Sequence, residues 1–76
     1  MTVQGVMLAF FEGTAGVGGR LHTNGKELWC FHWLLARRSD KGKVELIVLD
    51  PEVPAAVRKA HDRLAELAGF LEKRRM

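Results

Sequence analysis

The sequence predicts an α+β domain in which a four-stranded antiparallel β-meander is followed by one C-terminal amphipathic helix, in the order ββββα. Three features of the chain lead to this prediction. Apolar, β-prone runs alternate with turn signals over its first two thirds. The dipeptide Asn24-Gly25 is typical of a tight hairpin, because both residues tolerate a positive φ. Apolar residues near the C-terminus repeat at helical spacing, and the length of 76 residues indicates a single domain over 1–76.

The first third of the chain is expected to form two strands around a glycine-rich segment. Val, Phe and Met dominate residues 3–12, which predicts the first strand. Segment 13–19 is rich in glycine and is expected to be a loop or an irregular start to the second strand. It lacks the Lys and Ser/Thr with which a phosphate-binding loop closes. A two-residue turn at Asn24-Gly25 would pair Thr23 with Lys26.

Residues 26–38 allow two interpretations. The run is rich in aromatic residues and lies between two turn signals, which favours a third strand. Asn24 and Glu27 also match a capping box, so a helix over 25–38 is the alternative. The sequence alone leaves this choice open.

The last third of the chain predicts a turn, a strand and a helix. Residues 39–42 form a polar turn signal, and 43–49 read as the fourth strand. The helix is expected over about 54–74, because Pro54 suits a first helical turn. Its apolar positions follow a 3.6-residue period, at Val57, Ala60, His61, Leu64, Leu67, Ala68 and Leu71.

Strand alternation gives the predicted sheet two apolar faces. The helix should cover the face with Trp29, Phe31, Trp33 and Leu35. The second face would have no helix, and its expected members are Leu21, Leu28, Cys30, His32, Leu34, Ala36, Ile47 and Leu49. Each large apolar side chain left in water forgoes about 1.5–3 kcal/mol of burial. We therefore expect this face to be covered by a homodimer or another partner, or by strand one curling over it.

The cysteine content and the apolar runs bear on the compartment. Cys30 is the only cysteine, so no intramolecular disulfide can form, which favours a reducing compartment. The N-terminus has no basic segment before an apolar stretch, so we expect no signal peptide. No apolar run approaches the roughly 20 residues that span a bilayer. These features predict a cytoplasmic protein with no membrane partner.

No arrangement of residues predicts catalysis or metal binding. His22, Cys30, His32 and His61 lack the spacing of a zinc site. Cys30 has only His32 as a nearby base, and Ser39, the single serine, lies in a turn. We therefore expect no enzyme activity, no metal and no cofactor.

The basic residues suggest an alternative partner. The net charge is +3, and the whole excess lies in residues 37–76. A hairpin that combines cations with aromatic residues is typical of proteins that bind single-stranded nucleic acid. The candidate cations are Arg37, Arg38, Lys41 and Lys43, and the aromatic residues are Trp29, Phe31 and Trp33. We expect these rings to lie in the core instead.

Two resemblances add to this interpretation. The predicted order of elements over 17–72, with Lys41-Gly42-Lys43, Leu46 and Leu49 leading into a terminal helix, is similar to single-stranded-DNA-binding transcriptional coactivator domains. That resemblance implies nucleic-acid binding. The stretch from Leu21 to Trp29, continued by Ala36-Arg37-Arg38, resembles hairpins in small accessory proteins of phages and other mobile elements. Some of those proteins inhibit host enzymes, anti-CRISPR proteins among them.

The leading hypothesis is a non-enzymatic protein-binding module that acts as a homodimer. In this hypothesis it is a phage or mobile-element inhibitor or regulator of a host protein. The expected partner-binding residues are Leu28, His32, Leu34 and Phe70. Phe70 is included because it lies off the apolar stripe of the helix. The alternative is a small single-stranded nucleic-acid-binding protein that uses Arg37, Arg38, Lys41 and Lys43.

Overall fold

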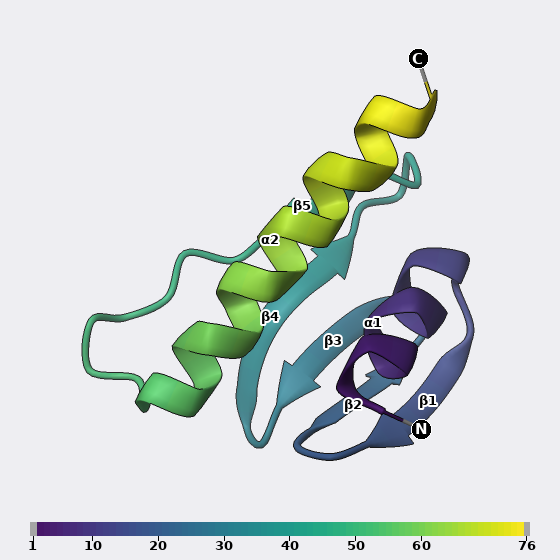
Figure 1. Cartoon of the computed structure of the whole chain (residues 1–76). Coiled ribbons are helices and arrows are strands. Elements are labelled where there is room, and N and C mark those ends of the chain that lie inside the picture. Colours follow the sequence, from purple (N-terminus) through teal and green to yellow (C-terminus); the bar gives the residue numbers. More distant parts are fainter. Residues whose placement is uncertain (1, 76) are drawn as a thin grey trace.

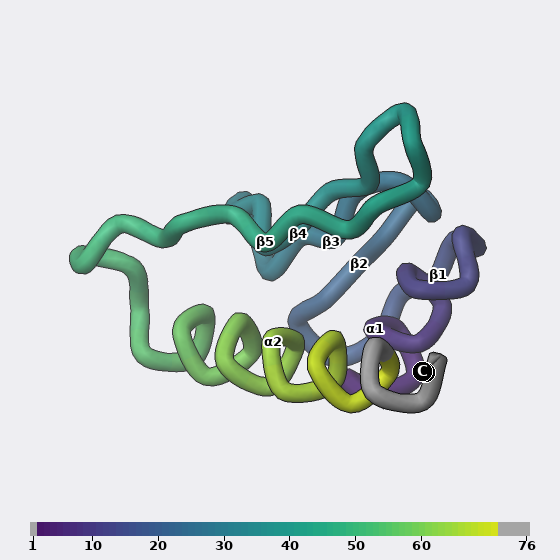
Figure 2. Tube along the Cα trace, turned by 90° about the horizontal axis from the view of Figure 1, so that it is seen from above, coloured from purple at the N-terminus to yellow at the C-terminus, as the bar shows by residue number. Residues whose placement is uncertain are grey.

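The computed structural model describes residues 2–75, and the side chains of residues 2–71. A five-stranded antiparallel sheet in the order β1-β2-β3-β4-β5 forms one layer, and two helices form the other (Figure 1, Figure 2). The α+β class, the antiparallel meander and the C-terminal helix are thus confirmed, whereas the count of four strands and one helix is wrong. The elements are α1 (Val3–Glu12), β1 (Ala15–Gly18), β2 (Leu21–Asn24), β3 (Glu27–Cys30), β4 (Trp33–Arg38), β5 (Val44–Leu46) and α2 (Ala55–Arg75).

Residues 3–12 form the helix α1 and not the predicted strand. Their apolar residues recur at spacings of three and four, at Val3, Val6, Met7, Phe10 and Phe11. The Thr2 hydroxyl accepts a hydrogen bond from the Gly5 N–H at 3.0 Å and caps the first turn. Gly13 ends the helix with a φ of 80°, which favours glycine. Helical spacing and two caps therefore outweigh the β-prone composition.

The glycine-rich segment contains the edge strand β1. It pairs with β2 so that Val17 lies opposite His22 and Gly18 opposite Leu21. The loop of the next hairpin is longer than predicted, because Thr23 pairs with Leu28 and not with Lys26. The Asn24 side-chain oxygen accepts hydrogen bonds from the N–H groups of Lys26 and Glu27, at 2.9 and 2.8 Å. These bonds hold residues 24–27 in a turn outside the β2–β3 ladder, although Asn24 still pairs with β1 and Glu27 with β4.

Residues 26–38 form neither one strand nor a helix. They fold back at Phe31 and His32, so that Cys30 at the end of β3 pairs with Trp33 at the start of β4. A bulge then shifts the register, because Leu28 pairs with Ala36 whereas Trp29 pairs with Leu34. This extra residue is Leu35, which is fully buried.

The C-terminal third has the predicted order of turn, strand and helix, but its strand is shorter than the predicted 43–49. The turn over 39–42 is closed by the Ser39 N–H, which donates to the Lys43 carbonyl at 2.8 Å. The strand β5 covers only Val44–Leu46, and the chain then continues without regular structure to α2. His61 on α2 hydrogen-bonds the Ile47 carbonyl at 2.7 Å and ties the helix to this connection. In both views α2 runs across β4 and β5 (Figure 1, Figure 2).

The core lies between the sheet and the helices, and it corrects the predicted faces. Leu28 and Cys30, expected on the uncovered face, are fully buried on the helix side. Trp29, expected beneath the helix, lies on the opposite side of β3. Strand one does not curl over the second face, because those residues form α1 and pack on the same side as α2. The buried cluster comprises Val6, Met7, Phe10, Leu21, Leu28, Cys30, Leu35, Ala36, Val53, Val57 and Leu64.

Candidate protein-binding surface

The side of the sheet turned away from both helices is here called the outer face. In Figure 2 both helices lie below β3, β4 and β5, whereas β2 slopes down toward β1, which lies at the level of α1; no element between residues 2 and 75 lies over the opposite side of the sheet. The strand register assigns residues to this face, because paired residues share a side and neighbours along a strand alternate. Its members by register are Ala15, Val17, His22, Asn24, Glu27, Trp29, Leu34, Arg37 and Glu45.

An apolar and aromatic row crosses the outer face. Val17, His22, Trp29 and Leu34 are consecutive register partners on β1 to β4, and we call them the cross-strand row. The rings of His22 and Trp29 stack in parallel, with centroids 6.3 Å apart and an interplanar angle of 3°. Val17 is 71% exposed, whereas Trp29 and Leu34 are half-buried. The row presents an aromatic ring beside apolar side chains, a combination that anchors protein contacts.

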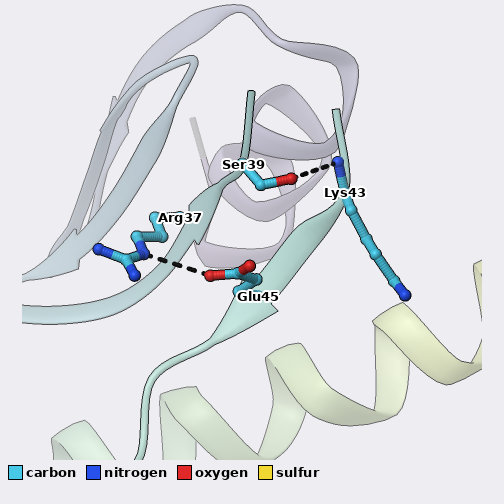
Figure 3. Close-up of polar contacts among 4 residues, drawn as sticks. All are labelled: Arg37, Ser39, Lys43 and Glu45. Carbon is cyan, nitrogen blue, oxygen red and sulfur yellow. Dashed lines mark hydrogen bonds and ion pairs between the residues drawn. The ribbon is translucent and has the colours of Figure 1, made fainter. Parts of the chain in front are cut away.

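A charged row lies beside it. Glu27, Arg37 and Glu45 are register partners on β3, β4 and β5. The Arg37 Nε lies 3.4 Å from a carboxylate oxygen of Glu45, and both side chains remain about half exposed (Figure 3). A surface pair of this kind contributes only about 0–1 kcal/mol to stability. The pair matters more for the charge pattern of the outer face, because the Arg37 cation lies between the carboxylates of Glu27 and Glu45.

The β3–β4 turn presents a second aromatic group at one end of the sheet. Phe31 has a φ of 56° and is 53% exposed. Its N–H still donates to the Arg20 carbonyl at 3.1 Å, which extends the β2–β3 ladder to the turn. The exposed side chain of His32 stacks on Trp33, with centroids 3.8 Å apart. Two adjacent rings are therefore available at the tip of the hairpin.

The predicted partner-binding residues do not form one surface. Leu34 belongs to the cross-strand row, and His32 lies at the β3–β4 turn. Phe70 is 56% exposed but lies in the helix layer, beside Gln4 and Met7 of α1. Leu28 is fully buried and is therefore not accessible to a partner. Leu34 and His32 thus remain as candidates on or beside the outer face.

The predicted basic cluster is divided among three places. Arg37 is paired with Glu45 on the outer face, and Lys41 and Lys43 lie at the β4–β5 turn, where the Lys43 N–H donates to the Ser39 hydroxyl at 3.2 Å (Figure 3). Arg38 turns to the helix side, where its Nη2 donates to the carbonyls of Phe10 and Phe11 at the C-terminal end of α1. These cations therefore do not line one groove.

An open groove of about 840 Å³ separates the N-terminal part of α1 from α2. Leu21 and Cys30 contribute to its lining together with Ala60. Burial raises the pKa of the Cys30 thiol, and the nearby Arg20 charge opposes this effect. Charges of both signs surround the groove, at Arg20, Lys59, Asp62, Arg63 and Glu66. The mixed rim gives no preference for a ligand of either sign.

Sequence reasoning missed most of the cross-strand row. On β2 the structure buries Leu21 and Thr23 and exposes His22 and Asn24, an alternation that the polar Thr23 hides in the sequence. This alternation places His22 on the outer face, and the register with β3 adds Trp29. The row becomes visible only when the turn at Phe31 is known, because that turn brings Leu34 beside Trp29.

No family model, curated protein or solved structure matches this chain. Within residues 2–75, no helix has the length and apolar character needed to cross a membrane. The part of the chain that the structure describes contains no group of three or more His, Cys, Asp or Glu side chains placed to hold a metal ion. The function is therefore inferred from the geometry of the surface.

Proposed function

We propose that the chain is a non-enzymatic protein-binding module that works through the outer face of its sheet. Its role would be that of the small inhibitors and regulators of host proteins found in phages and other mobile elements, which its hairpins resemble. One observation carries the proposal: the cross-strand row is uncovered, because both helices pack on the opposite side of the sheet.

The row has the chemistry of a protein contact. Tryptophan is enriched among the residues that dominate binding energy. Trp29 lies inside the row, between His22 on one side and Leu34 on the other. Complete burial of an exposed aliphatic side chain yields about 1.5–3 kcal/mol. Val17 is 71% exposed, so most of this burial free energy would be released only when a partner covers its side chain.

Charge favours a protein over a nucleic acid at this face. Single-strand binders combine stacking rings with a continuous basic groove. Here Glu27 and Glu45 flank Arg37, so a phosphate backbone would meet two carboxylates. Nucleic acid is the second candidate because of one observation, the His22–Trp29 stack on an open sheet, which is a type of platform on which bases stack.

A pair of matched substitutions tests the proposal. Leu34→Glu places a charge in the cross-strand row, whereas Leu8→Glu places the same charge on α1, where Leu8 is 39% exposed. Tagged protein is used to capture partners from a host lysate, with and without nuclease. We expect Leu34→Glu to lose a specific partner that Leu8→Glu and the nuclease-treated sample retain. Loss of capture after nuclease treatment would support the nucleic-acid candidate, and loss only with Leu8→Glu would place the contact on the helix layer.

A further inference from the structure

We propose that the outer face docks on the same face of a second copy of this chain, as a weak two-fold dimer with Phe31 as an anchor at its edge. The inference rests on the proposed function, because it uses the same surface and names one partner for it. In a two-fold contact each residue of one copy meets the complementary residue of the other. The outer face must therefore be complementary to itself.

The charged row supplies this self-complementarity. Along Glu27, Arg37 and Glu45 the charge alternates in sign across three adjacent strands. When two such rows face each other about a two-fold axis, a small offset brings the guanidinium of each copy against a carboxylate of the other. These three residues sum to one negative charge, although the whole chain carries +3. A second copy satisfies both signs on this face, whereas a polyanion satisfies only the arginine.

The conformation of Phe31 is a separate indication of a contact outside the chain. Four other described residues have positive φ, and all four are glycines: Gly13, Gly19, Gly25 and Gly42. Phe31 alone adopts this conformation with a large side chain, although glycine would form the turn without strain. Its ring is 53% exposed, so the core gains little from it. A strained and exposed aromatic residue at a turn fits an anchor for a partner better than a structural role.

The position of Phe31 connects it to the same face. Its hydrogen bond to Arg20 continues the β2–β3 register one step beyond Cys30. Phe31 follows Cys30 directly in the turn between β3 and β4, so it lies at the edge of the sheet, two residues along the chain from Trp29. The ring can therefore extend a contact centred on the cross-strand row.

The size of the face predicts a weak dimer. Five strands about 4.8 Å apart, with a rise of about 3.3 Å per residue, give at most an area on the order of 400 Å² per copy. Stable complexes bury about 800 Å² per partner, and transient ones bury less. We therefore expect a weak, transient dimer, which calls for a test that extends to millimolar concentrations.

Sedimentation equilibrium of the full chain from 5 µM to 2 mM tests the inference. The wild type is expected to shift from monomer to dimer within this range, and Leu34→Glu is expected to stay monomeric. Leu8→Glu is the control and is expected to dimerise as the wild type does. Phe31→Gly is expected to weaken the dimer about tenfold, whereas the melting temperature of this variant stays equal to that of the wild type or rises. Weaker association at an unchanged or higher melting temperature cannot result from unfolding.

A charge exchange tests the pairing itself. Arg37→Glu and the double variant Glu27→Arg/Glu45→Arg should each associate less than the wild type, and an equimolar mixture of the two should recover a heterodimer. A monomeric wild type at 2 mM, a dimer that Leu34→Glu leaves intact, or a mixture without recovery would overturn the inference. If the wild type is monomeric while Leu34→Glu still abolishes partner capture, the second copy is excluded and the proposed function stands. If the dimer forms as described but partner capture does not depend on Leu34, the second copy stands as the partner of the outer face. The capture of a host protein through this face is then excluded.

Discussion

Arg38 connects the sheet to the C-terminal end of α1, and removing its guanidinium is expected to destabilise the fold. Its Nη2 donates to the Phe10 carbonyl at 2.6 Å and to the Phe11 carbonyl at 2.9 Å. Its guanidinium carbon also lies 5.9 Å from the centre of the Phe10 ring. The last carbonyls of a helix lack partners within it, and here the Phe10 carbonyl already accepts the Gly13 N–H at 3.1 Å. The Arg38 cation adds a donor for both carbonyls and interacts favourably with the helix dipole.

The cost of Arg38→Met follows from these contacts. A hydrogen bond from a charged donor contributes about 1.5–3 kcal/mol, and a cation at a helix C-terminus about 0.3–1 kcal/mol. The buried Nε has no hydrogen-bond partner among the described residues, so its lost hydration offsets part of this gain. We expect a loss of about 2–4 kcal/mol in the free energy of unfolding. This is a large fraction of the roughly 4–11 kcal/mol typical for a chain of this length.

Guanidinium chloride denaturation followed by tryptophan fluorescence measures this loss. The midpoint of Arg38→Met is expected to fall by about 1–2 M relative to the wild type. Arg37→Met is the matched control, because Arg37 is the neighbouring arginine in sequence and lies on the outer face in an exposed ion pair with Glu45. Its expected cost is at most about 1 kcal/mol. Equal midpoints for the two variants would refute the claim that Arg38 holds α1 on the sheet.

Three further predictions concern stability. Leu64→Ala is expected to cost about 2–5 kcal/mol in the free energy of unfolding, because Leu64 is fully buried under the sheet; a melting curve like that of the wild type would mean that α2 is not part of the core. Gly25→Ala is expected to lower the melting temperature more than Gly42→Ala does. Both glycines have positive φ, but only the Gly25 Cβ would lie 2.6 Å from the Gly13 carbonyl oxygen, so equal effects would exclude the clash. Burial raises the pKa of Cys30, so the folded state holds this proton more tightly. The contribution of this thiol to stability is fully present below the ordinary pKa of 9.0 and is lost as pH rises from there through the raised folded-state pKa. Unfolding free energies at pH 8 and pH 10 check this, and Cys30→Ala should reduce the difference.

The sequence predicts the C-terminal part of the fold well. Apolar residues at helical spacing predict α2, and the polar 39–42 segment predicts the turn before β5. The α1 helix was predicted as a strand because Val, Phe and Met are β-prone, although the spacing from Val3 to Phe11 is helical. Composition and periodicity disagreed there, and the Thr2 cap together with Gly13 decided in favour of the helix.

The turn at Phe31 could not be predicted from local residue preferences. Neither Phe31 nor His32 is among the residues that favour a turn, and positive φ is rare for an aromatic residue. This turn and the bulge before Trp29 decide which residues share a face. The sequence therefore predicts that one sheet face is uncovered, but it does not identify the residues that form this face. Of the residues predicted to bind a partner, only Leu34 belongs to the cross-strand row.

The most direct measurement of the central claim is a concentration series of ¹H–¹⁵N correlation spectra of the wild-type chain. If the outer face is the binding surface and a second copy its partner, signals of Val17, His22, Leu34 and the Trp29 indole should shift between 20 µM and 2 mM. Leu8 and Phe70, in the helix layer, should remain unchanged over the same range. Shifts confined to the helix layer, or none at all, would contradict the claim.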